Sequence, residues 1–130
     1  METEVLLSIG SNDKLRHERV SEALDWLRGK LDYFRTSQIY PTLPVRGAKG
    51  EYVNAVAQGR TTDLKILEAD LKLYELSHGR DAAARAEGRV PIDIDVVVVN
   101  GEVVRPRDYA CDFFRIGLSA LADDAPDSGE

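Results

Sequence analysis

The sequence predicts an α+β fold of the ferredoxin-like, split βαβ type, an antiparallel sheet with helices packed on one face. The predicted elements follow one another as strand, helix, strand, strand, helix, strand, which is the order of that unit. The 130 residues are 43% hydrophobic and 31% charged, as in one globular domain. We expect this domain to span residues 1–122 and the acidic residues 123–130 to fray.

The first part of the chain predicts two strands and a helix. Residues 5–9 are an apolar run that ends in the turn sequence Gly-Ser-Asn-Asp. Residues 14–31 carry apolar side chains at helical spacing, and residues 33–40 predict the second strand. Residues 41–50 predict a loop, because two prolines and two glycines interrupt any regular element there.

The middle of the chain predicts a strand followed by a second amphipathic helix. The strand covers residues 52–58, and Thr62 or Asp63 caps the helix, which ends at Gly79. Residues 80–89 are rich in alanine and arginine, and their composition fits either a helical turn or a loop.

The last part predicts a buried strand and a short helix. Four consecutive valines, residues 96–99, are typical of a strand in a sheet. The Asn-Gly that follows predicts a tight turn into a return strand at residues 102–104. Residues 107–112 predict a loop, and residues 116–121 predict a final helix.

Two carboxylates precede the valine run. Asp93 and Asp95 share one face of the strand, with Cα atoms about 6.5–7 Å apart. Their charges repel and lose hydration together, and a cation would offset both effects. Magnesium prefers such oxygen ligands. The alternative interpretation is a solvated strand end that binds no metal.

Composition narrows the classes of function. A formal net charge of −6 argues against a nucleic-acid-binding surface over the whole protein. The single cysteine, Cys111, rules out an internal disulfide. No apolar run approaches the length of a membrane span, and no signal peptide is visible, so we expect a cytoplasmic protein. The oligomeric state is left open.

Six short segments occur in an order and spacing that are similar to those of a known family. They are Leu-Ser-Ile-Gly-Ser-Asn at 7–12, Ser-Gln-Ile-Tyr-Pro-Thr at 37–42, Tyr-Val-Asn-Ala-Val at 52–56, Glu75 with Gly79-Arg80, Ile-Asp-Ile-Asp at 92–95, and Leu-Ala-Asp-Asp-Ala-Pro-Asp at 121–127. Together they resemble the 6-hydroxymethyl-7,8-dihydropterin pyrophosphokinase family over nearly the whole chain.

The resemblance implies an enzyme of folate biosynthesis. The family transfers pyrophosphate from ATP to the hydroxymethyl group of a dihydropterin and releases AMP. The resemblance also implies two Mg²⁺ ions on Asp93 and Asp95, with Arg80 as a third catalytic residue.

The resemblance further implies the binding residues for the two substrates. The expected pterin contacts are Thr42, Leu43, Val45, Tyr52 and Asn54. The expected ATP contacts are Glu75, Arg80, Arg85, Arg89, Tyr109 and Arg115.

The chain departs from the family pattern in the catalytic segments. Ala86 and Val90 stand where the family carries arginines, and Glu87 stands where it carries a tryptophan. Phe114 replaces another arginine, and Ile116 replaces an aromatic residue that stacks on the pterin. Two hypotheses follow. The first is a divergent, active pyrophosphokinase, and the second is a non-catalytic binding or regulatory domain that has lost part of both sites.

Overall fold

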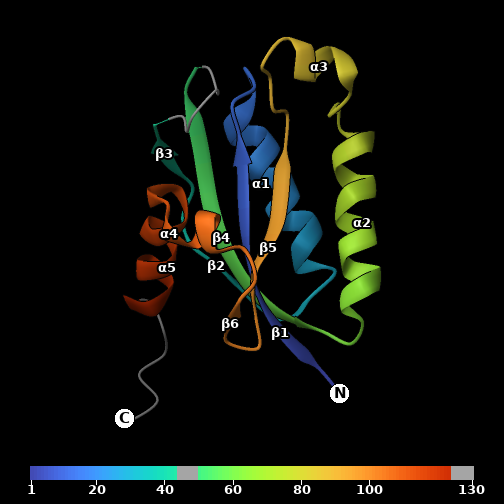
Figure 1. The fold of residues 1–130 in the computed structure, drawn as a ribbon, viewed down its shortest axis with the longest axis vertical. Helices are drawn as coiled ribbons and strands as arrows, with labels where there is room; N and C mark the ends of the chain where they lie inside the picture. Colours follow the sequence, from blue (N-terminus) through green and yellow to red (C-terminus); the bar gives the residue numbers. More distant parts are fainter. Residues whose placement is uncertain (44–49, 124–130) are drawn as a thin grey trace.

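A six-stranded antiparallel sheet forms the centre of the molecule (Figure 1). The computed structural model describes residues 1–43 and 50–123. The strands are β1 Thr3–Ser11, β2 Asp32–Thr36, β3 Tyr40–Thr42, β4 Tyr52–Thr61, β5 Asp93–Val99 and β6 Glu102–Val103. Their order is β2-β4-β1-β5-β6, and β3 also pairs with β4. Val45, an expected pterin contact, and residues 124–130 of the expected tail lie outside the described residues.

The two long helices of the split βαβ unit cover one face of the sheet, as the sequence predicts. The helices are α1 Arg16–Arg28, α2 Leu64–Ser77, α3 Ala82–Ala86, α4 Pro106–Ala110 and α5 Asp112–Asp123. In Figure 1, α4 and α5 lie on the opposite side of the sheet from α1 and α2. This second helical layer is an addition to the predicted architecture.

The sheet therefore carries a hydrophobic core on each face. Val5, Leu7 and Ile9 of β1 alternate toward the core that includes α1 and α2, and all three are fully buried. The smaller core on the other face gathers around Val56 of β4 and the fully buried Phe114 of α5. The helix α5 thus closes the face of the sheet that α1 and α2 leave uncovered.

A register shift in the β1–β5 ladder divides the valine run between these two cores. The shift falls between Leu6 and Leu7, opposite Val97. Val96 packs with α1 and α2, whereas Val97 packs with α5. Below the shift, Asp93 lies opposite Gly10 and Asp95 lies opposite Ser8. Directly opposed residues share a face, so both carboxylates point to the α5 side of the sheet.

Helix ends follow the predicted signals in α2. Asp63 is the N-cap residue, and its side chain accepts a hydrogen bond of 3.1 Å from the Ile66 N–H. Gly79 has a φ of +96°, which allows the chain to leave the helix. Residues 80–89 contain the short helix α3, capped by Asp81, so the helical alternative for this segment is the one found.

Three predicted boundaries are wrong. The predicted loop at residues 107–112 is mostly α4, because Pro106 fits the first turn of a helix. The last helix begins at Asp112 rather than residue 116. The predicted strand 33–40 is split, since the Ser37 hydroxyl accepts the Val56 N–H at 3.0 Å and interrupts the ladder before β3.

Among the described residues, no helix is long and apolar enough to cross a membrane.

Candidate active site

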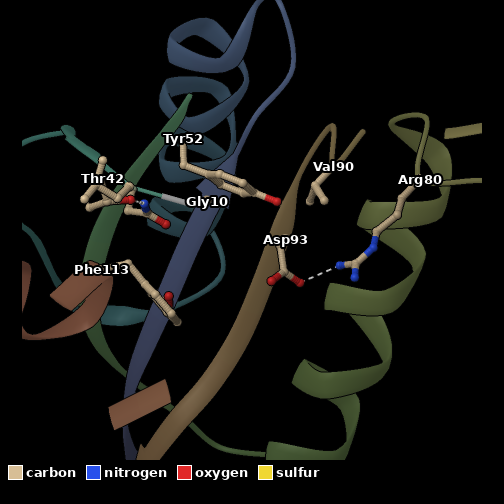
Figure 2. A pocket seen from close by; sticks show the side chains of 10 residues that line it. Gly10, Thr42, Tyr52, Arg80, Val90, Asp93 and Phe113 are labelled. Carbon is tan, nitrogen blue, oxygen red and sulfur yellow. Dashed lines mark hydrogen bonds and ion pairs between the residues drawn. The ribbon is translucent and has the colours of Figure 1, made fainter. Parts of the chain in front are cut away.

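A cavity of about 120 Å³ opens on the α5 side of the sheet. Six of the residues around it are ones that the sequence points to as site residues: Thr42, Leu43, Tyr52, Asn54, Arg80 and Asp93. Four others complete the wall: Ser8, Gly10, Val90 and Phe113. Figure 2 shows side chains from β3, β4, β5 and the end of α2 converging on this space. The fold therefore brings together segments that are far apart in the sequence.

The polar floor of the cavity is the Asn54 carboxamide. Asn54 is only 5% exposed, and its Nδ2 donates a short hydrogen bond to Thr42 Oγ1. A Cβ atom at Gly10 would collide with Asn54 Oδ1. The glycine on β1 and the threonine on β3 therefore fix the orientation of this amide from two sides.

Two aromatic side chains, Tyr52 and Phe113, line the same cavity (Figure 2). The sequence comparison with the family pattern predicts a loss of aromatic stacking, because Ile116 occupies the expected position. That expectation stays a prediction, and the structure adds that Phe113 at the start of α5 forms an aromatic wall of the cavity. The two consecutive phenylalanines could have indicated this wall from the sequence. Phe114 is buried in the core, and Phe113 faces the cavity.

Within the acidic pair on β5, Asp95 has a strongly raised pKa. Burial, and then the neighbouring Asp93 carboxylate, raise the pKa of Asp95 to about 7. Arg80 compensates part of this charge by a short contact with Asp93 and an ion pair of 3.1 Å with Glu75. Arg105 lies 3.9 Å from Asp95. The repulsion between the two carboxylates that the sequence predicts is therefore present. Arg80 lies beside Asp93, and Arg105 lies beside Asp95.

Glu75, an expected ATP contact, is a buried side chain that holds the backbone of β5. It is 5% exposed, and its Oε2 accepts the backbone N–H of Ile94 at 2.7 Å. Burial raises the pKa of Glu75, and the Ile94 hydrogen bond opposes that shift. The side chain thus ties α2 to the strand between the two aspartates.

The donor set at Asp93 and Asp95 fits magnesium. Among residues 1–43 and 50–123, no group of three or more His, Cys, Asp or Glu side chains forms a complete metal cage. Magnesium does not need one, because it is usually held by one or two carboxylates together with substrate phosphates and water. A buried carboxylate with a raised pKa is also a site where a bound cation lowers the electrostatic cost.

A second cavity, of about 270 Å³, lies beside Asp95. Ile94 and Val96 line it along β5, and Lys72 and Arg105 supply positive charge. The strand β5 pairs with β6 at Val98 and Val99, and nearer Asp95 its edge is met by the Glu75 side chain, which accepts the Ile94 N–H. Asp93 borders the first cavity and Asp95 borders the second. The acidic pair therefore borders both cavities, with one carboxylate at each.

The structure places the other expected ATP contacts away from the two cavities. Arg85 is exposed on α3, and Arg89 forms ion pairs with Glu87 at 3.2 Å and Asp13 at 3.7 Å. The Arg115 guanidinium lies over the ring of Tyr109, 5.4 Å from its centroid. The cation found beside Asp95 is instead Arg105, whose Nε also donates to Asp108 at 2.6 Å. Arg105 follows the return strand in sequence, and only the hairpin geometry brings it back to Asp95.

A family model described as 7,8-dihydro-6-hydroxymethylpterin-pyrophosphokinase (HPPK) matches residues 6–123. The chain belongs to the HPPK family. The match spans the sheet, both cavities and the helices on each face, which confirms the family resemblance drawn from the six segments. HPPK proteins are ATP-dependent diphosphokinases of folate biosynthesis that use ATP, a pterin and Mg²⁺. No curated protein sequence matches the chain.

Proposed function

We propose that this HPPK-family chain transfers pyrophosphate from ATP to the hydroxymethyl oxygen of a dihydropterin in an Mg²⁺-dependent reaction. One observation carries the proposal. Asp93 borders a cavity with an amide floor and aromatic walls, and Asp95 borders a second cavity in which Lys72 and Arg105 lie beside Glu68. A transfer between two substrates needs such an arrangement, because the acceptor and the donor must meet at the metal site.

The first cavity suits the pterin. A flat heterocycle with a polar edge can lie against Tyr52 and Phe113 while its edge forms hydrogen bonds with the fixed Asn54 carboxamide. Thr42 and Leu43 border the same space. Four of the five expected pterin contacts thus surround one cavity, which supports their assignment.

The second cavity suits the nucleotide. Lys72 and Arg105, which line it beside Glu68, would oppose the negative charge of phosphates. Asp93 and Asp95 would hold two Mg²⁺ ions, which would neutralise charge on the phosphate oxygens. Arg80 supplies a further cation beside Asp93.

In the proposed reaction the acceptor oxygen forms a bond to the β-phosphorus. The bond between that phosphorus and the α,β-bridging oxygen breaks, its electron pair stays with AMP, and the hydroxyl proton passes to solvent. The protein contributes mainly by holding the two substrates in line and by stabilising charge.

A second candidate is a binding or regulatory domain without catalysis. The charge balance near the nucleotide cavity favours it, because Asp108 already holds Arg105 in a 2.6 Å contact. In addition, Val90 stands where the family carries an arginine, so Arg80 is the cation left among the described residues that border the pterin cavity. Such a domain would bind the substrates without turnover.

The deciding experiment combines titration calorimetry with an AMP-release assay. The wild-type protein is titrated with a non-hydrolysable ATP analogue, with and without Mg²⁺, and then with 6-hydroxymethylpterin. We expect Mg²⁺-dependent AMP release that Asp95→Asn abolishes and that Asp25→Asn, an exposed α1 control, retains. Binding of both ligands without AMP release would favour the second candidate, and binding of neither would contradict both.

A further inference from the structure

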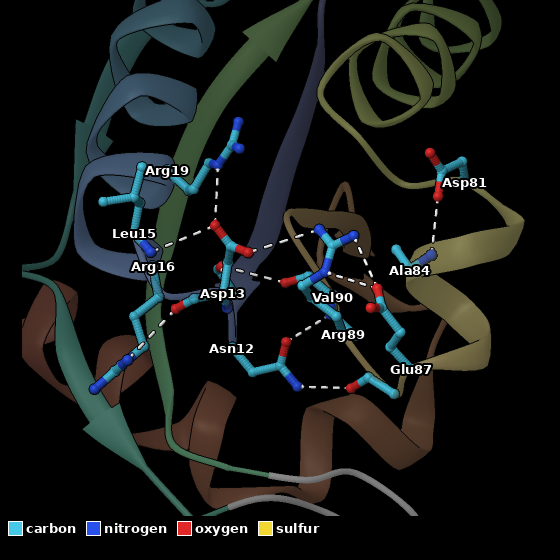
Figure 3. A network of polar contacts seen from close by, with 12 residues as sticks. Asn12, Asp13, Leu15, Arg16, Arg19, Asp81, Ala84, Glu87, Arg89 and Val90 are labelled. Atoms are coloured by element: carbon cyan, nitrogen blue, oxygen red, sulfur yellow. Dashed lines mark hydrogen bonds and ion pairs between the residues drawn. The ribbon is translucent and has the colours of Figure 1, made fainter.

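A polar network joins the turn after β1 to the segment that leads from α3 into β5 (Figure 3). At its centre is Asn12. The Asn12 Oδ1 accepts the backbone N–H of Val90 at 2.5 Å, and the Asn12 Nδ2 donates to the Gly88 carbonyl at 2.9 Å. One side chain thus bonds two backbone groups on a segment 76 to 78 residues further along the chain.

The carboxamide continues the β1–β5 ladder where the backbone alone cannot. The last strand pair is Gly10 with Asp93, and the backbone N–H of Asn12 then donates to the Val90 carbonyl at 3.0 Å. Pro91 has no N–H to donate, so regular pairing stops there. The Asn12 amide has the donor and acceptor of a peptide group, and it supplies the missing pair of bonds.

Neighbouring residues support the same junction. The Ser11 hydroxyl donates to the Val90 carbonyl at 3.2 Å and also accepts the Asp13 N–H. The buried Asp13 carboxylate lies 3.4 Å from Arg19 and 3.7 Å from Arg89. The turn after β1 and the segment before β5 are therefore held as one unit.

Val90 connects this junction to the proposed substrate site. It borders the first cavity, and it lies three residues before Asp93. No side chain of the turn after β1 is among the residues that border either cavity in the described part of the chain. Asn12 can therefore act on the cavity through Val90, without touching a ligand.

We infer that Asn12 is a positioning residue that sets the wall of the acceptor cavity through Val90. The inference rests on the proposed function only for the identity of the acceptor. Because Val90 borders the first cavity and not the second, the effect of Asn12 falls on pterin binding and not on nucleotide binding. The role requires asparagine, because aspartate lacks the donor to Gly88 and alanine lacks both groups.

The experiment uses the full chain with Asn12→Ala, the isosteric Asn12→Asp, and Val5→Ala as a control. Val5 is fully buried in the same strand, and its partner in the β1–β5 ladder is Val99 at the other end. Calorimetry measures the Kd of 6-hydroxymethylpterin and of an Mg²⁺–ATP analogue, and hydrogen exchange by NMR follows the Val90 amide.

We expect Asn12→Ala, which loses the bonds to Gly88 and Val90, to raise the pterin Kd roughly tenfold, with less than about a twofold change for the nucleotide. Its Val90 amide should exchange faster than in the wild type. Asn12→Asp should keep the Val90 protection and weaken pterin binding less. Val5→Ala should lower stability and leave both Kd values and the Val90 exchange unchanged.

An unchanged pterin Kd in Asn12→Ala would overturn the inference, as would an equal loss in Val5→Ala, which would indicate a general effect of stability. If the wild type binds no pterin, the proposed function fails, and the exchange data still test whether Asn12 holds Val90. Fast Val90 exchange in the wild type, or equal exchange in the wild type and Asn12→Ala, would overturn that role, and protection lost in Asn12→Ala but kept in Asn12→Asp and Val5→Ala would support it.

Discussion

At the scale of single residues, the ionised Asp95 carboxylate lowers the stability of the folded protein. Its carboxyl group is mostly buried, faces Asp93, and has a pKa raised to about 7 against 3.8 for the free side chain. The folded protein therefore binds a proton more tightly than the unfolded chain. By linkage, the free energy of unfolding falls as the pH rises between about 4 and 7, and the loss is complete above that window.

Asp95→Asn should remove this pH-dependent loss. We expect its stability relative to wild type to increase by roughly 2 kcal/mol between pH 5 and pH 8 in the absence of Mg²⁺. Urea unfolding at the two pH values measures the difference. Asp25→Asn removes an exposed carboxylate on α1, and a trend of the same size in that variant would contradict the assignment to Asp95.

Gly10 is a second residue whose size matters to the site. Gly10→Ala places a methyl group against Asn54 Oδ1, so the carboxamide must turn away from Thr42. We expect pterin binding to weaken at least roughly tenfold, through loss of an oriented hydrogen-bonding group. Calorimetry checks this value. Gly29→Ala is the control, because its added Cβ would come no closer than 3.6 Å to the nearest atom, and equal affinity in the two variants would refute the prediction.

At the scale of elements, α2 does more than cover the sheet. Its Glu75 side chain reaches the Ile94 N–H and Arg80 at once, so the last turn of the helix holds β5 and its cation in place. Without the Glu75 carboxylate, that buried N–H would lose its acceptor. The helix thereby links the packing of the core to the geometry of the acidic pair.

Glu75→Ala should lower the free energy of unfolding by about 1–3 kcal/mol, because a buried backbone donor loses its acceptor. Glu75→Gln keeps an acceptor oxygen and should recover most of the loss. Chemical denaturation gives both values. Glu68→Ala, an exposed position on the same helix, provides the comparison, and a loss there as large as in Glu75→Ala would argue against the buried hydrogen bond as the cause.

Local signals at the elements explain which parts the sequence could predict. Asp63 and Gly79 mark the ends of α2 chemically, and the apolar periodicity of β1 identifies its buried face. The short helix α4 was missed because its five residues carry no apolar stripe, and none of them is buried. Phe113 and Arg105 were missed as site residues for a different reason. Their positions depend on how the second helical layer and the β5–β6 hairpin pack, and no local pattern encodes that packing.

At the scale of the whole molecule, the sheet separates the larger hydrophobic core from the face that carries the first cavity. One face carries the larger core with α1 and α2, and the other carries α5 and the acceptor cavity. Asp93 borders that first cavity, and Asp95 borders the second cavity at the edge of β5. Binding at the site should therefore stabilise the fold as a unit.

Mg²⁺ with a non-hydrolysable ATP analogue should raise the midpoint of thermal unfolding. Ligand at a hundred times its Kd contributes about 2.7 kcal/mol by mass action. Differential scanning calorimetry checks this increase. Asp93→Asn should lose most of the increase, whereas Asp25→Asn should keep it. A shift of equal size without Mg²⁺ would place the nucleotide away from the acidic pair.

The part of the β5 edge that β6 leaves unpaired has a further consequence, for self-association. An unpaired strand edge is a template on which another chain can add a strand. Here the edge beside Asp95 is bordered by Lys72 and Arg105, charged side chains of the kind that discourage such pairing. A nucleotide in the edge cavity would cover the same backbone. On the proposed function, we therefore expect the ligand-free protein to aggregate more readily than the nucleotide-bound protein during storage and refolding.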